Sequence, residues 1–209
     1  MRQILLVLLI ASLVGCGSPS MNTRDVEVDE SYVGGPPANM LVLSLQEDSV
    51  HDSRVVIERG FTQQLKNAGV DAIAGYTRFD SIDALVADPD SFEPALKDLG
   101  IASVVFLEPI KMDLDYDPGE YAQRRSAYRA LGLDTSASIN LISDLAREAS
   151  AAKVVMNVGL WMTGTKDDVF NATYDINAPG SYDVDTARGY ASQFALNVID
   201  DFKQYGFIR

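Results

Sequence analysis

The sequence predicts an α/β (α+β) domain in which helices pack on a mixed sheet, with the element order β-α-β-α-β, a helical insertion and then β-β-α. Short apolar runs predict buried strands, and apolar residues three and four positions apart predict helices. Near the C-terminus, strict alternation of apolar and polar residues predicts a hairpin. These patterns run through residues 40–209 without an internal repeat, so we expect one globular domain there.

The first half of this domain alternates between strand and helix patterns. Apolar runs over residues 40–45, 70–76 and 101–107 predict three strands. The helical faces between them consist of Ile57, Phe61, Leu65 and Ala68, then Ile82, Leu85 and Val86, and then Phe92, Leu96 and Leu99. Gly69 and Gly100 follow the first and the last of these faces, and glycine commonly ends a helix.

The C-terminal part predicts a hairpin followed by a last helix. Residues 154–162 and 170–176 alternate apolar and polar side chains, and the turn-forming residues 164–168 separate them. Asp183 or Asp185 is a suitable N-cap for the helix that follows. The apolar face of that helix consists of Ala187, Tyr190, Ala191, Phe194, Val198 and Phe202.

Residues 109–152 lie between the third strand and the hairpin and predict a helical insertion. Asp117 suits a helix cap, and Pro118 suits the first position of that helix. Apolar residues at helical spacing favour a second helix over residues 138–151. A strand over residues 137–142 is the competing interpretation, and the sequence leaves the two open.

The start of the chain has the features of a bacterial secretion signal. The positively charged Arg2 precedes an apolar run over residues 4–14. This run is too short to span a bilayer as a helix, which needs about 20 residues. A charged start and a short apolar run before small residues are typical of a cleaved signal peptide, so we expect residues 1–15 to be removed.

The boundary Leu13-Val14-Gly15-Cys16 resembles the lipobox of bacterial lipoproteins. The resemblance implies that Cys16 becomes the mature N-terminus and carries a thioether-linked lipid with further acyl chains, such as palmitate. Two or more chains anchor a protein stably. Because Gly17 rather than Asp follows the cysteine, we expect the outer membrane as the location, with the domain facing the periplasm. A buried N-terminal helix with a chance cysteine is the competing interpretation.

Residues 16–39 predict a flexible tether. They are rich in Gly, Ser, Pro and acidic residues and contain little apolar surface to bury. The whole chain has a formal charge of −13, which argues against nucleic-acid binding, because phosphate contacts need Lys and Arg. Cys16 is the only cysteine, so the chain has no internal disulfide framework.

The element order, together with the turn at Thr163-Gly164, resembles the α/β domain shared by the TolB N-terminal domain, CsgG, LpoB and PelC. Residues 40–45 correspond to the opening strand of that domain, residues 57–70 to its first helix, and residues 160–165 to the strand that ends in Thr-Gly. The resemblance spans residues 40–206. It implies a non-enzymatic module of the cell envelope, an accessory or structural component of an outer-membrane-associated complex that holds a protein partner or self-associates into a ring.

The sequence contains no recognisable catalytic constellation, and we expect no cofactor. His51 is the single histidine, and a Ser-His-Asp triad would have to use it. A histidine at a helix entry is the preferred interpretation of that residue. The chain has no nucleophile elbow, P-loop or dinucleotide-binding loop. The alternative function is a lipid-anchored periplasmic hydrolase that acts on glycan or peptide through a carboxylate pair, which 30 acidic residues do not exclude.

A weak calcium motif lies at the start of the predicted insertion. Asp113, Asp115 and Asp117 have the spacing of the first ligands of an EF-hand loop. Pro118 replaces the required glycine of that loop, and Arg124 replaces its last glutamate. We therefore expect no metal and prefer a solvated strand end.

A cluster of arginine and tyrosine residues is the candidate partner-binding site. It consists of Tyr121, Arg124, Arg125, Tyr128 and Arg129. On a helix, residues 121, 125 and 128 share one side, with 124 and 129 nearby, and both residue types are enriched in interface hot spots. A solvated helix that pairs with the domain's own acids is the competing interpretation.

Overall fold

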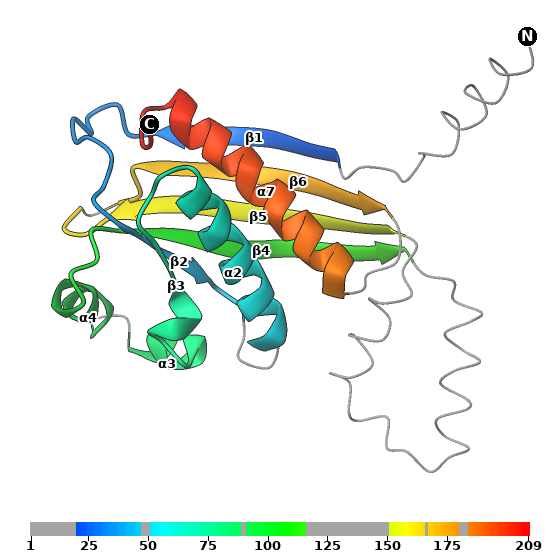
Figure 1. The fold of residues 1–209 in the computed structure, drawn as a ribbon, viewed down its shortest axis with the longest axis horizontal. Helices are drawn as coiled ribbons and strands as arrows, with labels where there is room; N and C mark the ends of the chain where they lie inside the picture. Colours follow the sequence, from blue (N-terminus) through cyan, green and yellow to red (C-terminus); the bar gives the residue numbers. More distant parts are fainter. Residues whose placement is uncertain (1–19, 47–50, 89–90, 116–150, 166, 180–183) are drawn as a thin grey trace, which may run out of the picture.

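A computed structural model describes residues 20–46, 51–88, 91–115, 151–165, 167–179 and 184–209. Within these ranges, six strands form one sheet in the order β1-β6-β5-β4-β2-β3 (Figure 1). The strands are β1 (Ser20–Val28), β2 (Met40–Ser44), β3 (Ala72–Ala74), β4 (Ser103–Asp115), β5 (Ala151–Met162) and β6 (Phe170–Pro179). The helices are α2 (His51–Asn67), α3 (Ile82–Ala87), α4 (Phe92–Asp98) and α7 (Val184–Gln204), with a short 3-10 helix, η2 (Gly75–Thr77).

The sheet is mixed, as predicted. β2 pairs in parallel with β3 and β4, and helices α2, α3 and α4 lie in the crossovers between these strands. β4, β5, β6 and β1 pair antiparallel. The predicted hairpin is confirmed, with Val154 opposite Ile176 and Leu160 opposite Phe170. In the part of the chain that is described, no helix combines the length and the apolar character that crossing a membrane requires.

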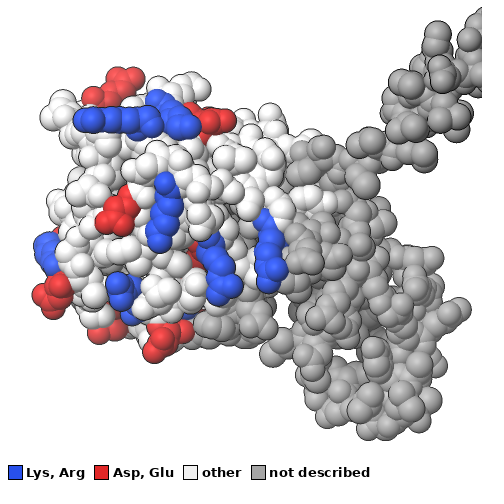
Figure 2. All heavy atoms as spheres, viewed as in Figure 1, with Lys and Arg blue, Asp and Glu red and all other residues white. Residues whose placement is uncertain are grey.

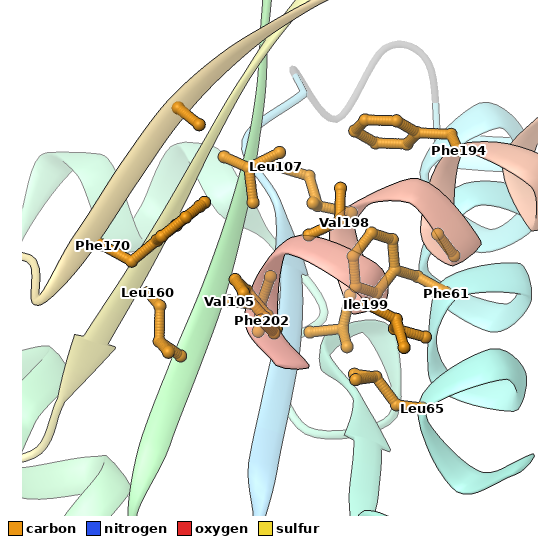
Figure 3. Packing of buried hydrophobic residues seen from close by; sticks show 14 of the residues in the cluster. Phe61, Leu65, Val105, Leu107, Leu160, Phe170, Phe194, Val198, Ile199 and Phe202 are labelled. Carbon is orange, nitrogen blue, oxygen red and sulfur yellow. The ribbon is translucent and has the colours of Figure 1, made fainter. Parts of the chain in front are cut away.

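Helices α2 and α7 cover one face of the sheet, and the main core lies between this face and the two helices (Figure 3). Phe61 of α2 meets Phe194 of α7 edge to face at a ring-centroid distance of 5.8 Å. Phe202 of α7 packs in the same way on Phe170 of β6 at 5.2 Å. These side chains are almost fully buried. Burial of each large apolar side chain contributes about 1.5–3 kcal/mol, so this layer supplies much of the folding free energy.

The opposite face of the sheet is covered only in part. Helices α3 and α4 pack a second, smaller core on β2 and the start of β4, and this core includes Leu41, Leu43, Leu96 and Val104. Over β5, β6 and β1, no helix in the described ranges packs on this side. We call this region the open face. The side chains there are mostly polar and only partly buried, and they include Arg24, Asn157, Asn171, Thr173 and Asp175.

A buried ion pair connects α2 to the end of β2. Arg54 and Glu58 are both fully buried, and Arg54 Nε donates to Glu58 Oε1 over 2.9 Å. Arg54 Nη2 also donates to the carbonyl of Phe79 at 2.7 Å. The Glu58 carboxylate accepts hydrogen bonds from the backbone N–H groups of Ser44 and Tyr76. Both charged groups therefore have hydrogen-bond partners besides each other, which helps to offset the desolvation of a buried pair.

The second predicted strand is shorter than its apolar run indicates. The sequence predicts a strand over residues 70–76, whereas β3 ends before Gly75 and η2 follows. A Cβ on Gly75 would come within 2.7 Å of the Val42 carbonyl oxygen, so the chain passes directly against β2 at this point. The N–H of Tyr76 then donates to the Glu58 side chain rather than to a neighbouring strand. This close passage and side-chain bond end the strand early.

The predicted tether is wrong for residues 20–28. These residues form β1, which pairs antiparallel with β6 from Ser20 opposite Asn177 to Val28 opposite Phe170. Met21 and Val28 pack against the main core. The compositional argument fails here because an edge strand needs only a few apolar side chains when a neighbouring strand supplies its hydrogen bonds.

The predicted insertion begins and ends at the wrong residues. Residues 109–152 were expected to interrupt the sheet, but β4 continues to Asp115 and β5 already starts at Ala151. The register shifts between Pro109 and Lys111, so Ile110 lies at a bulge. A bulge accommodates the proline, which has no N–H for the ladder, and the strand then continues. The helices and the alternative strand predicted between residues 116 and 150 lie outside the described residues.

Candidate functional site

Two hollows lie next to each other, one on the open face and one between it and β4, and Asp168 lines both. The larger has a volume of about 590 Å³ and the smaller about 230 Å³. The larger is lined by Glu27, Val28, Asp29, Trp161, Asp167, Asp168 and Asn171, and the smaller by Leu45, Phe106, Glu108, Asn157, Gly159 and Asp168. We call the two together the acidic groove. Five of these lining residues are carboxylates, and no described lining residue is Lys or Arg.

The end of β1 and the turn between β5 and β6 form the walls of the groove. Gly164, with φ +96°, makes the turn possible. The N–H of Val169 donates to the Leu160 carbonyl at 2.8 Å and closes the hairpin. The N–H of Asp29 in turn donates to the Val169 carbonyl at 3.0 Å. Backbone bonds thus hold the acids of two distant sequence segments on the same side of the sheet.

Asp168 lies across β5, in space that a missing side chain leaves free. A Cβ on Gly159 would come within 2.6 Å of Asp168 Oδ2. Asn171 Nδ2 donates to the same oxygen at 3.3 Å. Burial raises the pKa of Asp168, the Asn171 hydrogen bond opposes this shift, and the charge of Asp167 adds to it. Within the described part of the chain, no Lys or Arg side chain pairs with the charged form of Asp168.

Trp161 supplies an aromatic surface to the larger hollow. Its Nε1–H donates to the Thr165 carbonyl at 3.1 Å, which fixes the indole against the turn. The polar group of the indole is thus satisfied within the protein, and the ring is what remains for a ligand. An aromatic ring next to carboxylates suits a cation, because the ring face attracts positive charge.

Asp29 is held in its charged form by its neighbour. The hydroxyl of Ser31 donates to Asp29 Oδ1 at 2.6 Å, and the N–H of Ser31 donates to the same atom at 2.9 Å. Both hydrogen bonds lower the pKa of Asp29, and the bond from the hydroxyl has the larger effect. The groove therefore combines a readily ionised acid with Asp168, whose pKa is raised.

None of the predicted site residues within the described ranges lines this groove. Cys16 and the arginine and tyrosine cluster at residues 121–129 lie outside the described residues. Asp113 and Asp115 lie in β4, so the EF-hand interpretation does not hold for its first two ligands, because an EF-hand holds them in a loop; Asp117 is not described. His51 is the first residue of α2. Among the described residues, no group of three or more potential metal ligands gathers.

Sequence reasoning missed the groove because its walls meet only through strand pairing. Glu27 and Asp29 were assigned to the tether, whereas Asp167 and Asp168 were assigned to a turn. One signal was present: Gly159 stands inside the strand that precedes this turn, on the face opposite the regular apolar positions. A glycine inside a strand often marks the close approach of another group.

Comparisons with known proteins find similarity only at the level of structure. No protein-family model matches the sequence, and no curated protein matches it. The PelC dodecamer from Paraburkholderia phytofirmans has a TM-score of 0.43 and 9% sequence identity, and covers 84% of this chain and 94% of that chain. A single-substitution variant of that dodecamer has the same TM-score and identity, with 85% and 96% covered. PelC is one of the proteins whose domain the element order resembles.

Proposed function

We propose that this chain is a lipid-anchored binding and assembly module of the bacterial cell envelope. It is secreted by means of residues 1–15, attached to the outer membrane through lipid on Cys16, and exposed to the periplasm. There the acidic groove binds a cationic group of an envelope partner. The observation that carries the proposal is the set of five carboxylates that line the groove, with Trp161 in its larger hollow, on a sheet face that the described helices cover only in part.

Electrostatics favour a cation in this groove. Neighbouring carboxylates in a hollow repel one another, and no cation among the described residues offsets the desolvation of the partly buried Asp168. A bound ammonium or guanidinium group relieves both costs, and the focused negative potential attracts it from solution. The nearby Arg24 does not fill this role among the described contacts, because it pairs with Asp25 and Asp175.

A second copy of the chain is one source of such a group. Figure 2 shows Lys and Arg side chains distributed over the face formed by α2 and α7. Exposed basic residues of these helices include Arg59, Lys66 and Lys203. This helical face lies on the opposite side of the sheet from the groove. A contact between the two faces joins different surfaces of the two copies, and such contacts form rings when the rotation closes.

Titration of the mature lipoprotein in detergent with a short Lys-rich peptide tests the groove. Each exposed ion pair contributes on the order of 0.5 kcal/mol, so a variant with Glu108→Gln and Asp168→Asn should bind the peptide roughly fivefold more weakly. Asp98→Asn is the control, because Asp98 is exposed on α4 and does not line the groove. Binding should also weaken as salt is added. Equal affinity of the groove variant and the control contradicts the proposal.

A hydrolase that uses a carboxylate pair is the second candidate, and one observation favours it. Burial raises the pKa of Asp168 in a groove that contains other carboxylates, as is typical of a general acid. The two candidates differ in what Asp168→Asn should do. In a hydrolase this substitution abolishes the cleavage of glycan or peptide substrates, whereas in a binding module no cleavage occurs with either protein.

A further inference from the structure

The anchor and the sheet are very close in the sequence. Only Gly17, Ser18 and Pro19 separate Cys16 from Ser20, the first residue of β1. Even a fully extended chain covers at most about 3.6 Å per residue, so Cys16 cannot lie farther than about 14 Å from Ser20. A tether that reached residue 39 would have allowed several times this distance. Because β1 belongs to the sheet, the anchor is short.

β1 is fixed to the domain by side chains as well as by its ladder. The Asp201 carboxylate of α7 accepts hydrogen bonds from Thr23 Oγ1 of β1 at 3.3 Å and from the Tyr174 hydroxyl of β6 at 2.7 Å. Asn197 of α7 contacts the Met21 sulfur at 3.2 Å. These contacts connect β1, β6 and α7. The position of Ser20 relative to the membrane therefore determines the position of the whole domain.

The start of β1 defines one end of the sheet. The strand registers place Ser20 opposite Asn177, Asn177 opposite Lys153, and Lys153 opposite Asp113. We call this row the anchor end. The acidic groove lies toward the other end, where β1 finishes at Val28. Figure 1 shows α4 and the C-terminus at that other end too. At about 3.3 Å per residue, the two ends of β1 are about 25 Å apart.

We infer that the lipid on Cys16 holds the anchor end of the sheet against the membrane surface and presents the acidic groove away from it. The inference rests on the proposed lipidation. The covalent link alone keeps Ser20 within about 14 Å of the lipid-bearing residue. A domain that lay flat would bring the five groove carboxylates against a phospholipid surface of net negative charge, which would repel them.

The consequence is a defined binding direction. The groove lies well beyond the Debye length of about 8 Å from the anchor end, so membrane charge is screened from it. A partner must then approach from the periplasmic side rather than along the bilayer. The anchor end therefore contacts the lipid surface. The groove stays free to bind a cationic protein group.

Two fluorescent labels test this orientation in the lipidated protein. The thioether uses the only native thiol, so Asn177→Cys at the anchor end and Asp98→Cys at the groove end can each be labelled alone. The proteins are reconstituted in vesicles of phosphatidylethanolamine and phosphatidylglycerol that contain headgroup-nitroxide lipid. We expect severalfold stronger quenching at position 177 than at position 98. Insertion of about twelve Gly and Ser residues after Pro19 should remove most of the difference, because the longer linker is flexible.

The outcomes separate the orientation from the anchor. Equal quenching at both positions, or stronger quenching at position 98, in a protein whose mass confirms the lipid overturns the orientation and leaves the anchor intact. A protein without lipid, which the vesicles do not retain, overturns both claims. Strong quenching at position 177 that the inserted linker does not change also contradicts the inference, because the short link would then not be its cause.

Discussion

Gly159 and Asp168 share one place in the sheet: the carboxylate of Asp168 occupies the space that a side chain on residue 159 would fill. A Cβ there would come within 2.6 Å of Asp168 Oδ2. The atom in the way is the far end of a flexible side chain, so it can move without displacing the backbone. A side chain at residue 159 should therefore change the shape of the groove with little effect on the stability of the domain.

Gly159→Ala should therefore change binding more than stability. The added methyl group pushes the Asp168 carboxylate off β5, which alters both hollows at once. We expect the free energy of unfolding in urea to change by less than about 1 kcal/mol, because the Asp168 side chain can move aside without a shift of the backbone. Affinity for a Lys-rich peptide should fall. A large loss of stability with unchanged affinity would show that residue 159 serves packing alone.

Asp168→Asn should stabilise the protein at neutral pH. Burial raises the pKa of Asp168 above the value it has in the unfolded chain, so ionisation of this group opposes folding at pH 7. Acidification through the raised folded-state pKa protonates the group and removes that penalty. The stability advantage of the Asn variant should thus be largest at neutral pH and shrink toward acidic pH. Urea denaturation at several pH values measures it, and an advantage that grows on acidification refutes the assignment.

Two ion pairs with the same helical spacing should differ strongly in their effect on stability. Arg54 and Glu58 are fully buried, whereas the side chains of Glu93 and Lys97 are 41% and 60% exposed. Glu58→Gln leaves a buried guanidinium without its counter-charge and should cost about 3 kcal/mol. Glu93→Gln should cost less than about 1 kcal/mol. Both values come from urea denaturation, and similar losses would mean that the buried pair is not as isolated from water as its geometry indicates.

Deletion of residues 20–28 should destabilise the domain. The tether interpretation predicts no effect, but β1 hydrogen-bonds along β6 and packs Met21 and Val28 on the core. Loss of two partly buried apolar side chains removes roughly 3 kcal/mol, before the exposed edge of β6 is counted. A chain that starts at residue 29 should melt at a lower temperature than one that starts at Ser20. Identical melting temperatures would show that β1 does not stabilise the domain, as the tether interpretation predicts.

The difference between β1 and the other strands shows what local patterns can predict. The hairpin alternates clearly because one of its faces packs on α7, and Phe61 and Leu65 mark the buried side of α2 by their spacing. β1 has a weak pattern, since its outward side chains are polar and its neighbour β6 lies far away in the sequence. Apolar periodicity indicates which side chains are buried, but it does not indicate which strands pair. It therefore predicts the helices and does not predict the edge strand β1.

The groove was unpredictable for a related reason. Its acids come from the end of β1 and from the turn before β6, and only long-range pairing brings them together. The Arg54–Glu58 pair was missed too, because a charged pair four residues apart normally marks an exposed helix face. In both cases the decisive information is which elements pack together, and no single window of the sequence contains it.

The intact mass of the protein purified from membranes tests the lipid anchor, on which the proposed function and the orientation both depend. We expect a chain that begins at Cys16 and carries a thioether-linked diacylglyceryl group, and we expect the Cys16→Ser variant to remain unprocessed and to lack the added lipid mass. A native protein that retains Met1 or begins at Cys16 without added lipid would contradict it.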